Sequence, residues 1–390
     1  MPIFQVAEYQ QRLSNVKQRM REAGLDVLLA SHPANMNYLS GYDGWSYYVH
    51  QLVVVALDAP QPVWIGREMD VAGARATVWL NADCIEGYPD HFVDSATQHP
   101  MHYVADVLHE RGWHTGRIGV EMDAWYFTAR AYKELVEKLP RATFADAWPL
   151  VNWVRIIKSP AELALMRGAG EIVTRSMQVA IDSIEPGVRE NDAVANITHA
   201  QLSGTPEFWG DYPATLAAVP SGAKSAAPHL TWSGTPFSND VASNIELGGC
   251  HQRYHAALAR TLYLGTPPTK LQHLADVTAE GLEVTLEIIR AGITAEQVEA
   301  AWRGVIRKAG YEKKSRIGYS IGLNYPPDWG EQTASLRDGD KTLLEPNMCF
   351  HLMLGMWMDD WGFELSETIA VTASGYELLT NFPRKLFVKN

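Results

Sequence analysis

The chain has 390 residues, 46% of them hydrophobic and 20% charged, an ordinary globular composition at a length that suits two domains better than one. Its formal net charge of -12 at pH 7 argues against a nucleic-acid partner, because an acidic protein repels phosphate. Cys84, Cys250 and Cys349 are far apart and odd in number, which indicates neither a disulfide framework nor a Cys-x-x-Cys metal site and favours the cytoplasm. We expect no signal peptide and no membrane partner, because no basic segment precedes an apolar run and the longest apolar stretch, 52–57, is too short to span a bilayer.

The first part of the chain predicts an α/β domain. Apolar residues at helical spacing indicate a helix over 7–23, and Gly24 is typical of a helix end. Short apolar runs typical of strands then alternate with helical patterns, a sequence of elements that favours an α/β arrangement. The expected strands are 26–31, 52–57, 117–122 and 142–147, and the expected helices lie near 101–111 and 127–138.

A capping box marks the start of a second domain. In Ser159-Pro160-Ala161-Glu162 the serine and glutamate side chains can bond each other's backbone N–H, and proline suits the first helical position. This pattern opens a helix that runs to about Asp182. Helices and strands of antiparallel type then mix, so we expect an α+β protein with domains 1–156 and 157–390. The expected helices are 189–203, 271–289 and 294–308, and the expected strands are 241–249, 254–263, 348–358 and 363–371.

Several common catalytic motifs are absent from the sequence. It contains no GxGxxG after a strand, no GxxxxGK[ST], no HExxH and no GxSxG. The order and spacing of five blocks instead resemble the creatinase, prolidase and methionine aminopeptidase superfamily, from IKSPAELALMR (157–167) to GFELSETIAVT (362–372). This resemblance implies a creatinase-type N-terminal domain, a C-terminal pita-bread domain and a homodimer.

Metallopeptidases of that superfamily bind two metal ions through two Asp, one His and two Glu. The resemblance places these five ligand positions on residues of mixed chemistry, namely Glu246, Ala257, Tyr319, Met353 and Ser366, the last with Glu367 beside it. Alanine and methionine supply no hard oxygen ligand. We therefore expect no metal and no other cofactor.

Four segments resemble ectoine hydrolases most: SGYDGWSYYVHQ (40–51), APHLTW (227–232), YPPDWGE (325–331) and WMDDWGFE (357–364). The resemblance implies a small-molecule substrate, with hydrolytic opening of the cyclic amidine ring of ectoine to N-acetyl-diaminobutyrate and with hydroxyectoine as a second candidate substrate. Two alternatives stay open. One is a creatinase-like amidinohydrolase, and the other is a non-catalytic pita-bread protein that binds a peptide.

The predicted catalytic residues are His229 and Glu246. His229 matches the catalytic histidine of creatinase, the metal-free enzyme of the superfamily, although a loop histidine is otherwise a surface or capping residue. Glu246 would hold the amidinium or attack it. Strand alternation places its side chain on the face opposite the apolar residues Ile245 and Leu247, and that face could equally be the solvated one.

The remaining candidates are expected to bind the substrate. Arg316 and Arg260 are candidates for its carboxylate, because a guanidinium binds carboxylates bidentately. The other predicted substrate-binding residues are Tyr319, Tyr325, Asp328, Trp329, Glu331, Asp360, Glu364, Trp45 and Tyr47.

Overall fold

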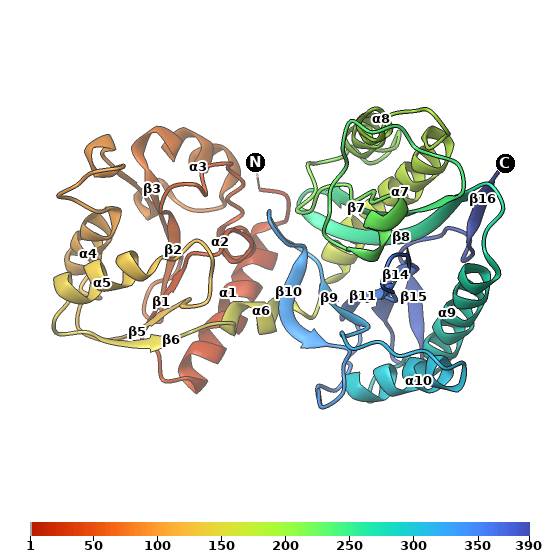
Figure 1. The fold of residues 1–390 in the computed structure, drawn as a ribbon. Coiled ribbons are helices and arrows are strands. Elements are labelled where there is room, and N and C mark those ends of the chain that lie inside the picture. The colour runs from red at the N-terminus through yellow and green to blue at the C-terminus, as the bar shows by residue number, and fades with distance from the viewer. Residues whose placement is uncertain (1) are drawn as a thin grey trace. The chain divides into compact units, whose positions relative to one another are not determined.

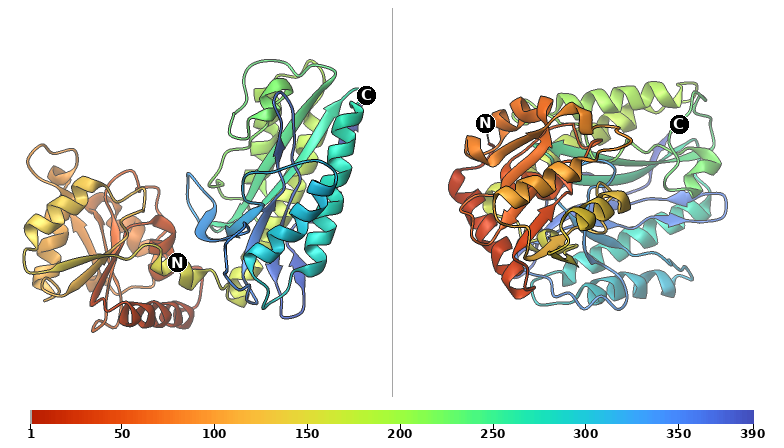
Figure 2. Two further views of the ribbon diagram at one scale, coloured as in Figure 1. Left: turned by 60° about the horizontal axis from the view of Figure 1, so that its bottom comes forward. Right: turned by 90° about the vertical axis from the view of Figure 1, so that its left-hand side faces the viewer.

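The computed structural model describes residues 2–390 and divides into two compact units (Figures 1 and 2). The first unit ends at Arg155 and the second is Ile156–Asn390. The sequence placed this boundary one residue later, between 156 and 157. In the described part of the chain, no helix combines the length and the apolar composition needed to cross a bilayer.

The N-terminal unit is built on a mixed sheet with strand order β4-β3-β2-β1-β5-β6. The strand β1 pairs antiparallel with β2 and parallel with β5, and both its faces are buried. Helices lie on both sides of this sheet (Figure 2). The strands are β1 (Val27–Ala30), β2 (Leu52–Ala56), β3 (Val63–Arg67), β4 (Ile85–Tyr88), β5 (Arg117–Val120) and β6 (Thr143–Asp146).

The helices of this unit close a core around the sheet. The buried side chains of two of them, α4 (Pro100–Glu110) and α5 (Ala129–Lys138), pack against the alternate residues Val27 and Leu29 of β1, as the period of a strand requires. The other helices are α1 (Val6–Glu22), α2 (Pro33–Ser40), α3 (Val71–Thr77), α6 (Leu150–Arg155) and the short 3₁₀ turns η1 (Glu68–Asp70), η2 (Ala82–Cys84) and η3 (Asp90–Phe92).

The second unit opens with the predicted capping box. The Ser159 hydroxyl accepts from the N–H of Glu162 at 3.2 Å, and the Glu162 carboxylate accepts from the N–H of Ser159 at 2.9 Å. This cap starts α7 (Pro160–Ser183), which packs against a long hairpin. The other helices are α8 (Glu190–Ser203), α9 (Thr269–Ile288), α10 (Ala295–Lys308) and the 3₁₀ turn η4 (Gly222–Ala226).

Two sheets of the second unit meet at β8. The hairpin strands β7 (Val241–His251) and β8 (Tyr254–Leu264) pair in register from end to end around Gln252 and Arg253, whose positive φ values of 48° and 68° suit a tight hairpin turn. The strand β8 also pairs with β16 (Phe387–Lys389), and the other sheet has the order β10-β9-β11-β14-β15. Its strands are β9 (Gly318–Ile321), β10 (Gly330–Ser335), β11 (Cys349–Met353), β14 (Ser366–Val371) and β15 (Tyr376–Leu378), and β12 (Met356–Trp357) pairs with β13 (Gly362–Phe363).

The predicted elements all form, with two subdivisions. The single strands expected at 348–358 and 363–371 are each divided in two by the turn that separates β11 from β12 and β13 from β14. Hydroxyl groups of β14 join the two sheets, because Ser366 accepts from the N–H of Ala259 at 2.6 Å and Thr368 from that of Ala257 at 2.9 Å.

Candidate active site

Glu246 lies in the middle of β7, directly across from Ala259 of β8. Its neighbours Ile245 and Leu247 are fully buried in the core under α7, so strand alternation turns the glutamate to the other face. There its side chain is only partly exposed, and burial raises the pKa of Glu246 to about 8. The negative charges of Glu364 and Asp328 act in the same direction, so the site holds several carboxyl groups that disfavour one another's ionisation.

Glu364 is the second carboxyl of this group and is buried just after β13. Trp357 donates its Nε1–H to the carboxylate at 2.8 Å. Burial raises the pKa of Glu364 to about 7, while the Trp357 hydrogen bond and the positive charge of Lys313 act in the opposite direction. The Lys313 ammonium lies 4.2 Å from the centre of the Trp357 ring, within cation–π range. One indole therefore contacts both a buried cation and a buried acid.

Tyr319 of β9 supplies a hydroxyl group to the site. Its oxygen accepts from Trp329 Nε1 at 2.8 Å and lies 3.2 Å from His351 Nδ1. The Arg316 guanidinium covers the Tyr319 ring at 4.3 Å. Burial raises the pKa of Tyr319, and the negative charge of Glu246 raises it further. The hydroxyl therefore stays protonated and can act as a donor.

His351 of β11 is a site residue that the sequence argument missed. It lies directly across from Tyr319 in the sheet, and burial lowers its pKa to about 3, with the charge of Arg316 acting in the same direction. The ring is therefore neutral near pH 7. The sequence could have indicated this residue, because His351 lies two residues before the ligand position Met353 and alternate residues of a strand share a face. Lys313 and Trp357 were also missed, since neither lies at a ligand position of the superfamily.

The loop between β9 and β10 brings Asp328 and Trp329 to the same place. Asp328 accepts from the N–H of Gly330 at 2.9 Å, and burial raises its pKa while the charge of Arg316 opposes the shift. The buried Trp329 ring passes close to β7, so a Cβ added at Gly248 would lie 2.8 Å from it. Glycine at 248 therefore lets the indole reach Tyr319.

Two predicted substrate-binding residues have structural roles instead. Glu331 is fully buried and forms an ion pair of 2.6 Å with Lys158, so its carboxylate is not available to a ligand. Arg260 is equally buried and pairs with Glu367 at 2.6 Å. Its remaining N–H groups donate to the carbonyl oxygens of Ala259, Ser366, Phe382 and Pro383. These ion pairs correct the predictions for Glu331 and Arg260, and Arg316 remains the arginine near the site.

The other predicted residues lie at the surface or outside the group just described. His229 is exposed in a turn after η4, and Asp360 is exposed in the turn between β12 and β13. Tyr325 is buried beneath the Arg253 guanidinium, 5.5 Å from its ring centre, and so packs the β9–β10 loop. Trp45 and Tyr47 belong to the N-terminal unit, where their rings lie 5.0 Å apart. Their roles in binding and catalysis stay predictions.

Comparison with known proteins decides the family. The model of metallopeptidase family M24 matches residues 164–373, and that of the creatinase/prolidase N-terminal domain matches residues 12–157. The chain belongs to metallopeptidase family M24. It is 47% identical to ectoine hydrolase of Halomonas elongata over 99% of this chain and 98% of that protein. It is 45% identical to an uncharacterized hydrolase/peptidase of Sinorhizobium fredii, over 99% of both. The predicted resemblance to ectoine hydrolases and their superfamily is thus confirmed.

Solved structures share the fold of this chain. Prolidase of Thermococcus sibiricus superposes with a TM-score of 0.85 at 19% identity, covering 98% of this chain and 99% of that one. A dipeptidase of Pyrococcus horikoshii gives a TM-score of 0.83 at 21% identity, covering 97% of this chain and 100% of that one. The prediction of an α+β protein with a creatinase-type N-terminal domain and a pita-bread domain is confirmed, and this M24 chain is a hydrolase of that family.

The side chains of this M24 site do not fit the metal pair that the family name implies. At the ligand positions, Ser366 bonds β8, and Ala257 and Met353 offer no oxygen. Glu367 points to the opposite face of β14, where it is held by Arg260. Across residues 2–390, no three His, Cys, Asp or Glu side chains are grouped closely enough to hold a metal ion. The groups that this site offers to a substrate are carboxyl, hydroxyl and indole groups.

Proposed function

We propose that this protein is a metal-independent hydrolase that opens the cyclic amidine ring of ectoine, and of hydroxyectoine, to N-acetyl-diaminobutyrate. The observation that carries the proposal is the group formed by Glu246, Glu364 and the Tyr319 hydroxyl, in which Glu246 and Tyr319 stand at ligand positions of the superfamily. Burial raises the pKa values of both carboxyl groups, and the charge of Glu364 raises that of Glu246 further, while Lys313 offsets only part of the shift of Glu364. A flat amidinium would supply the positive charge that Glu246 lacks. The 47% identity to an ectoine hydrolase agrees with this substrate class.

The reaction needs no Lewis acid, because the carbon of an amidinium is already electrophilic. Water adds its oxygen to that carbon, the ring C–N bond breaks, and the departing nitrogen takes a proton, so an amide and an amine result. Glu246 either holds the cation or adds to the carbon first and is then released by water. Tyr319 can donate to the developing oxygen, since its hydroxyl stays protonated. Trp329 and Trp357 fix the directions of the Tyr319 and Glu364 oxygens by their N–H groups.

The test is product formation by the purified protein without added metal. Ectoine, hydroxyectoine and creatine are each incubated with the protein, with and without a chelator, and the products are identified by proton NMR. We expect acetylated diaminobutyrate from ectoine at a rate the chelator does not change. Cleavage of creatine alone would favour the creatinase-like alternative, and turnover of none of the three would favour the peptide-binding one. Activity that the chelator abolishes and added metal restores would contradict metal independence.

His229→Ala is expected to lower kcat by about 10²–10⁴-fold if His229 transfers the protons. Because the side chain is exposed in a turn, the melting temperature should be unchanged. The matched control is His199→Ala, an exposed histidine on α8, which should alter neither quantity. Steady-state kinetics and thermal melting of the variants measure both effects. Wild-type turnover in His229→Ala would remove this histidine from the mechanism.

We further infer a cytoplasmic homodimer. The N-terminal unit exposes Trp45 and Tyr48, with 59% and 71% of their surfaces accessible, close together in the sequence. Exposed aromatic side chains that lie close together are typical of interaction surfaces. Static light scattering should give twice the chain mass, and a fully active monomer would contradict the dimer.

A further inference from the structure

A surface hollow near the candidate site is lined mainly by cationic side chains. It has a volume of about 460 Å³ and lies where the loop before β9 meets the end of β10. This size is within the range of small-ligand sites. The lining residues are Arg303, Lys314, Ser315, Arg316, Arg337 and Asp338. A cationic hollow is unexpected on a chain with a net charge of -12.

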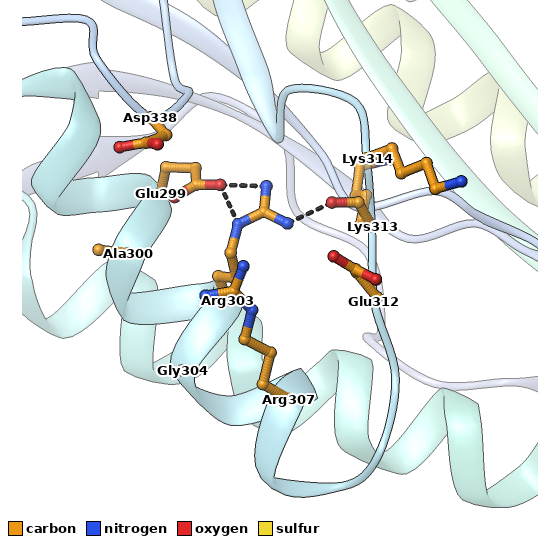
Figure 3. A pocket seen from close by; sticks show the side chains of 9 residues that line it. All are labelled: Glu299, Ala300, Arg303, Gly304, Arg307, Glu312, Lys313, Lys314 and Asp338. Atoms are coloured by element: carbon orange, nitrogen blue, oxygen red, sulfur yellow. Dashed lines mark hydrogen bonds and ion pairs between the residues drawn. The ribbon is translucent and has the colours of Figure 1, made fainter.

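Arg303 is already neutralised and does not contribute to the excess charge. Figure 3 shows its guanidinium between the carboxylate of Glu299 on α10 and the main-chain carbonyl of Lys313. The hollow drawn there adjoins the first one, with which it shares Arg303, Lys314 and Asp338. The charge of the first hollow therefore depends on the other cations.

Arg316 and Arg337 converge on one hydroxyl oxygen. Arg316 Nη1 donates to Ser335 Oγ at 2.9 Å, and Arg337 Nη2 approaches the same atom at 3.5 Å. A hydroxyl group carries no charge and neutralises neither guanidinium. Throughout the described chain, neither of these arginines nor Lys314 forms an ion pair with a carboxylate. Two guanidinium groups are thus held side by side, and the charge of Arg337 acts on that of Arg316.

The nearby carboxylates offset part of this charge without pairing with it directly. Asp340 uses its two oxygens to accept from the N–H groups of Ser335 and Thr342, at 2.8 and 2.9 Å, and its charge acts on Arg337. Asp328 acts on Arg316 in the same way, and Asp338 lines the hollow. Because none of these carboxylates forms an ion pair with Arg316 or Arg337, the guanidinium N–H groups stay open to an oxyanion, which guanidinium groups bind bidentately.

We propose that this hollow binds a phosphate group, either free or as a small monoester, held between Arg316 and Arg337. The site differs from the proposed amidinium site, which is acidic and selects a cation. The two are connected, because the guanidinium that would bind phosphate also covers the Tyr319 ring at 4.3 Å. Occupancy should pull Arg316 toward the hollow and so change how Tyr319 is held. This connection rests on the proposed function, whereas phosphate binding does not.

Isothermal titration calorimetry of the full-length protein tests the binding directly. Inorganic phosphate, glycerol phosphate and succinate are titrated into the wild type, Arg337→Gln and Arg307→Gln. Arg307 is the matched control, because it lines only the adjoining hollow. We expect phosphate binding to the wild type, at least about tenfold weaker binding to Arg337→Gln, and no change in Arg307→Gln. Tighter binding of glycerol phosphate than of phosphate identifies a monoester as the ligand, and equal binding identifies the free ion.

Three outcomes would overturn the proposal. They are no phosphate binding to the wild type, equal binding to Arg337→Gln, or tighter binding of succinate than of either phosphate compound. The connection to Tyr319 is tested by turnover of ectoine with and without phosphate. We expect phosphate to change kcat in the wild type and not in Arg337→Gln. Purely competitive inhibition that persists in Arg337→Gln would place the anion in the substrate's own position and contradict a second site. Calorimetry stays decisive even if ectoine is not the substrate.

Discussion

Glu246→Gln is expected to abolish most of the turnover of ectoine. The amide keeps the shape of the side chain and removes the charge that would balance the amidinium. If Glu246 only holds the cation, the loss in kcat should be about 10²–10³-fold, as for removal of one stabilising group. If it is the nucleophile, the loss should be on the order of 10⁶-fold, as for removal of a nucleophile. The size of the loss therefore distinguishes the two roles.

The matched control for this variant is Glu312→Gln. Glu312 is an exposed glutamate on the loop before β9, so its replacement should leave kcat and KM unchanged. The measurement is steady-state kinetics for the large rates and single-turnover analysis for the small ones. Unchanged kinetics in Glu246→Gln would exclude both roles and remove the principal support for an amidinium substrate.

The pH dependence of the same variant gives an independent check. An amidinium substrate binds to ionised carboxylates. Burial raises the pKa of Glu364 to about 7 and that of Glu246 to about 8. The kcat/KM of the wild type should therefore rise from pH 6 to pH 9. The stability of the fold should change with pH in the opposite sense. A carboxyl group whose pKa is higher in the folded than in the unfolded state binds its proton more tightly in the folded state, so low pH favours folding. Wild-type stability should fall from pH 4.5 to about 8, so Glu246→Gln should melt at a higher temperature than the wild type at pH 9 and equally at pH 4.

Local sequence patterns predicted features whose signal lies within a few consecutive residues. The capping box at Ser159 and Glu162 defines the start of α7 from four consecutive residues, and the alternation around Glu246 defines its side of β7. The strand β10 was missed for the opposite reason. It begins with a glycine, buries the charged Glu331 and contains Gln332 at a φ of 55°, a pattern typical of a loop. The Glu331 carboxylate pairs with Lys158, which is far away in the sequence.

The candidate site shows the same limit. Glu246, Glu364, Tyr319, Asp328 and Trp329 were all predicted, because the resemblance places them in blocks with characteristic spacing. Their electrostatic effects on one another could not be derived from those blocks, since burial sets the pKa values. Arg260 was assigned to the substrate because its charge suits a carboxylate. The sequence does not show that Glu367 and a set of carbonyl groups already occupy its N–H groups.

The second large effect is expected from that buried ion pair. Arg260→Met should lower the free energy of unfolding of the C-terminal unit by about 3–5 kcal/mol, because it leaves the buried carboxylate of Glu367 without its main partner. The wild-type pair has almost no solvent exposure on either side chain. The matched control is Arg167→Ala, which breaks the exposed pair with Glu377 and should cost less than about 1 kcal/mol. Denaturant unfolding monitored by circular dichroism measures both variants.

A second substitution separates the cost of an unpaired charge from the loss of packing. Adding Glu367→Leu to Arg260→Met removes the orphaned carboxylate, so much of the lost stability should return. Arg384, the other cation beside Glu367, keeps a partner in the double variant, because it also pairs with Glu283 at 2.7 Å. If the double variant is less stable than Arg260→Met, the arginine acts instead through its carbonyl contacts with residues 382 and 383, which hold the C-terminal segment against β8. In that case Arg260→Lys, which retains the charge but not the five-donor fork, should be nearly as unstable as Arg260→Met.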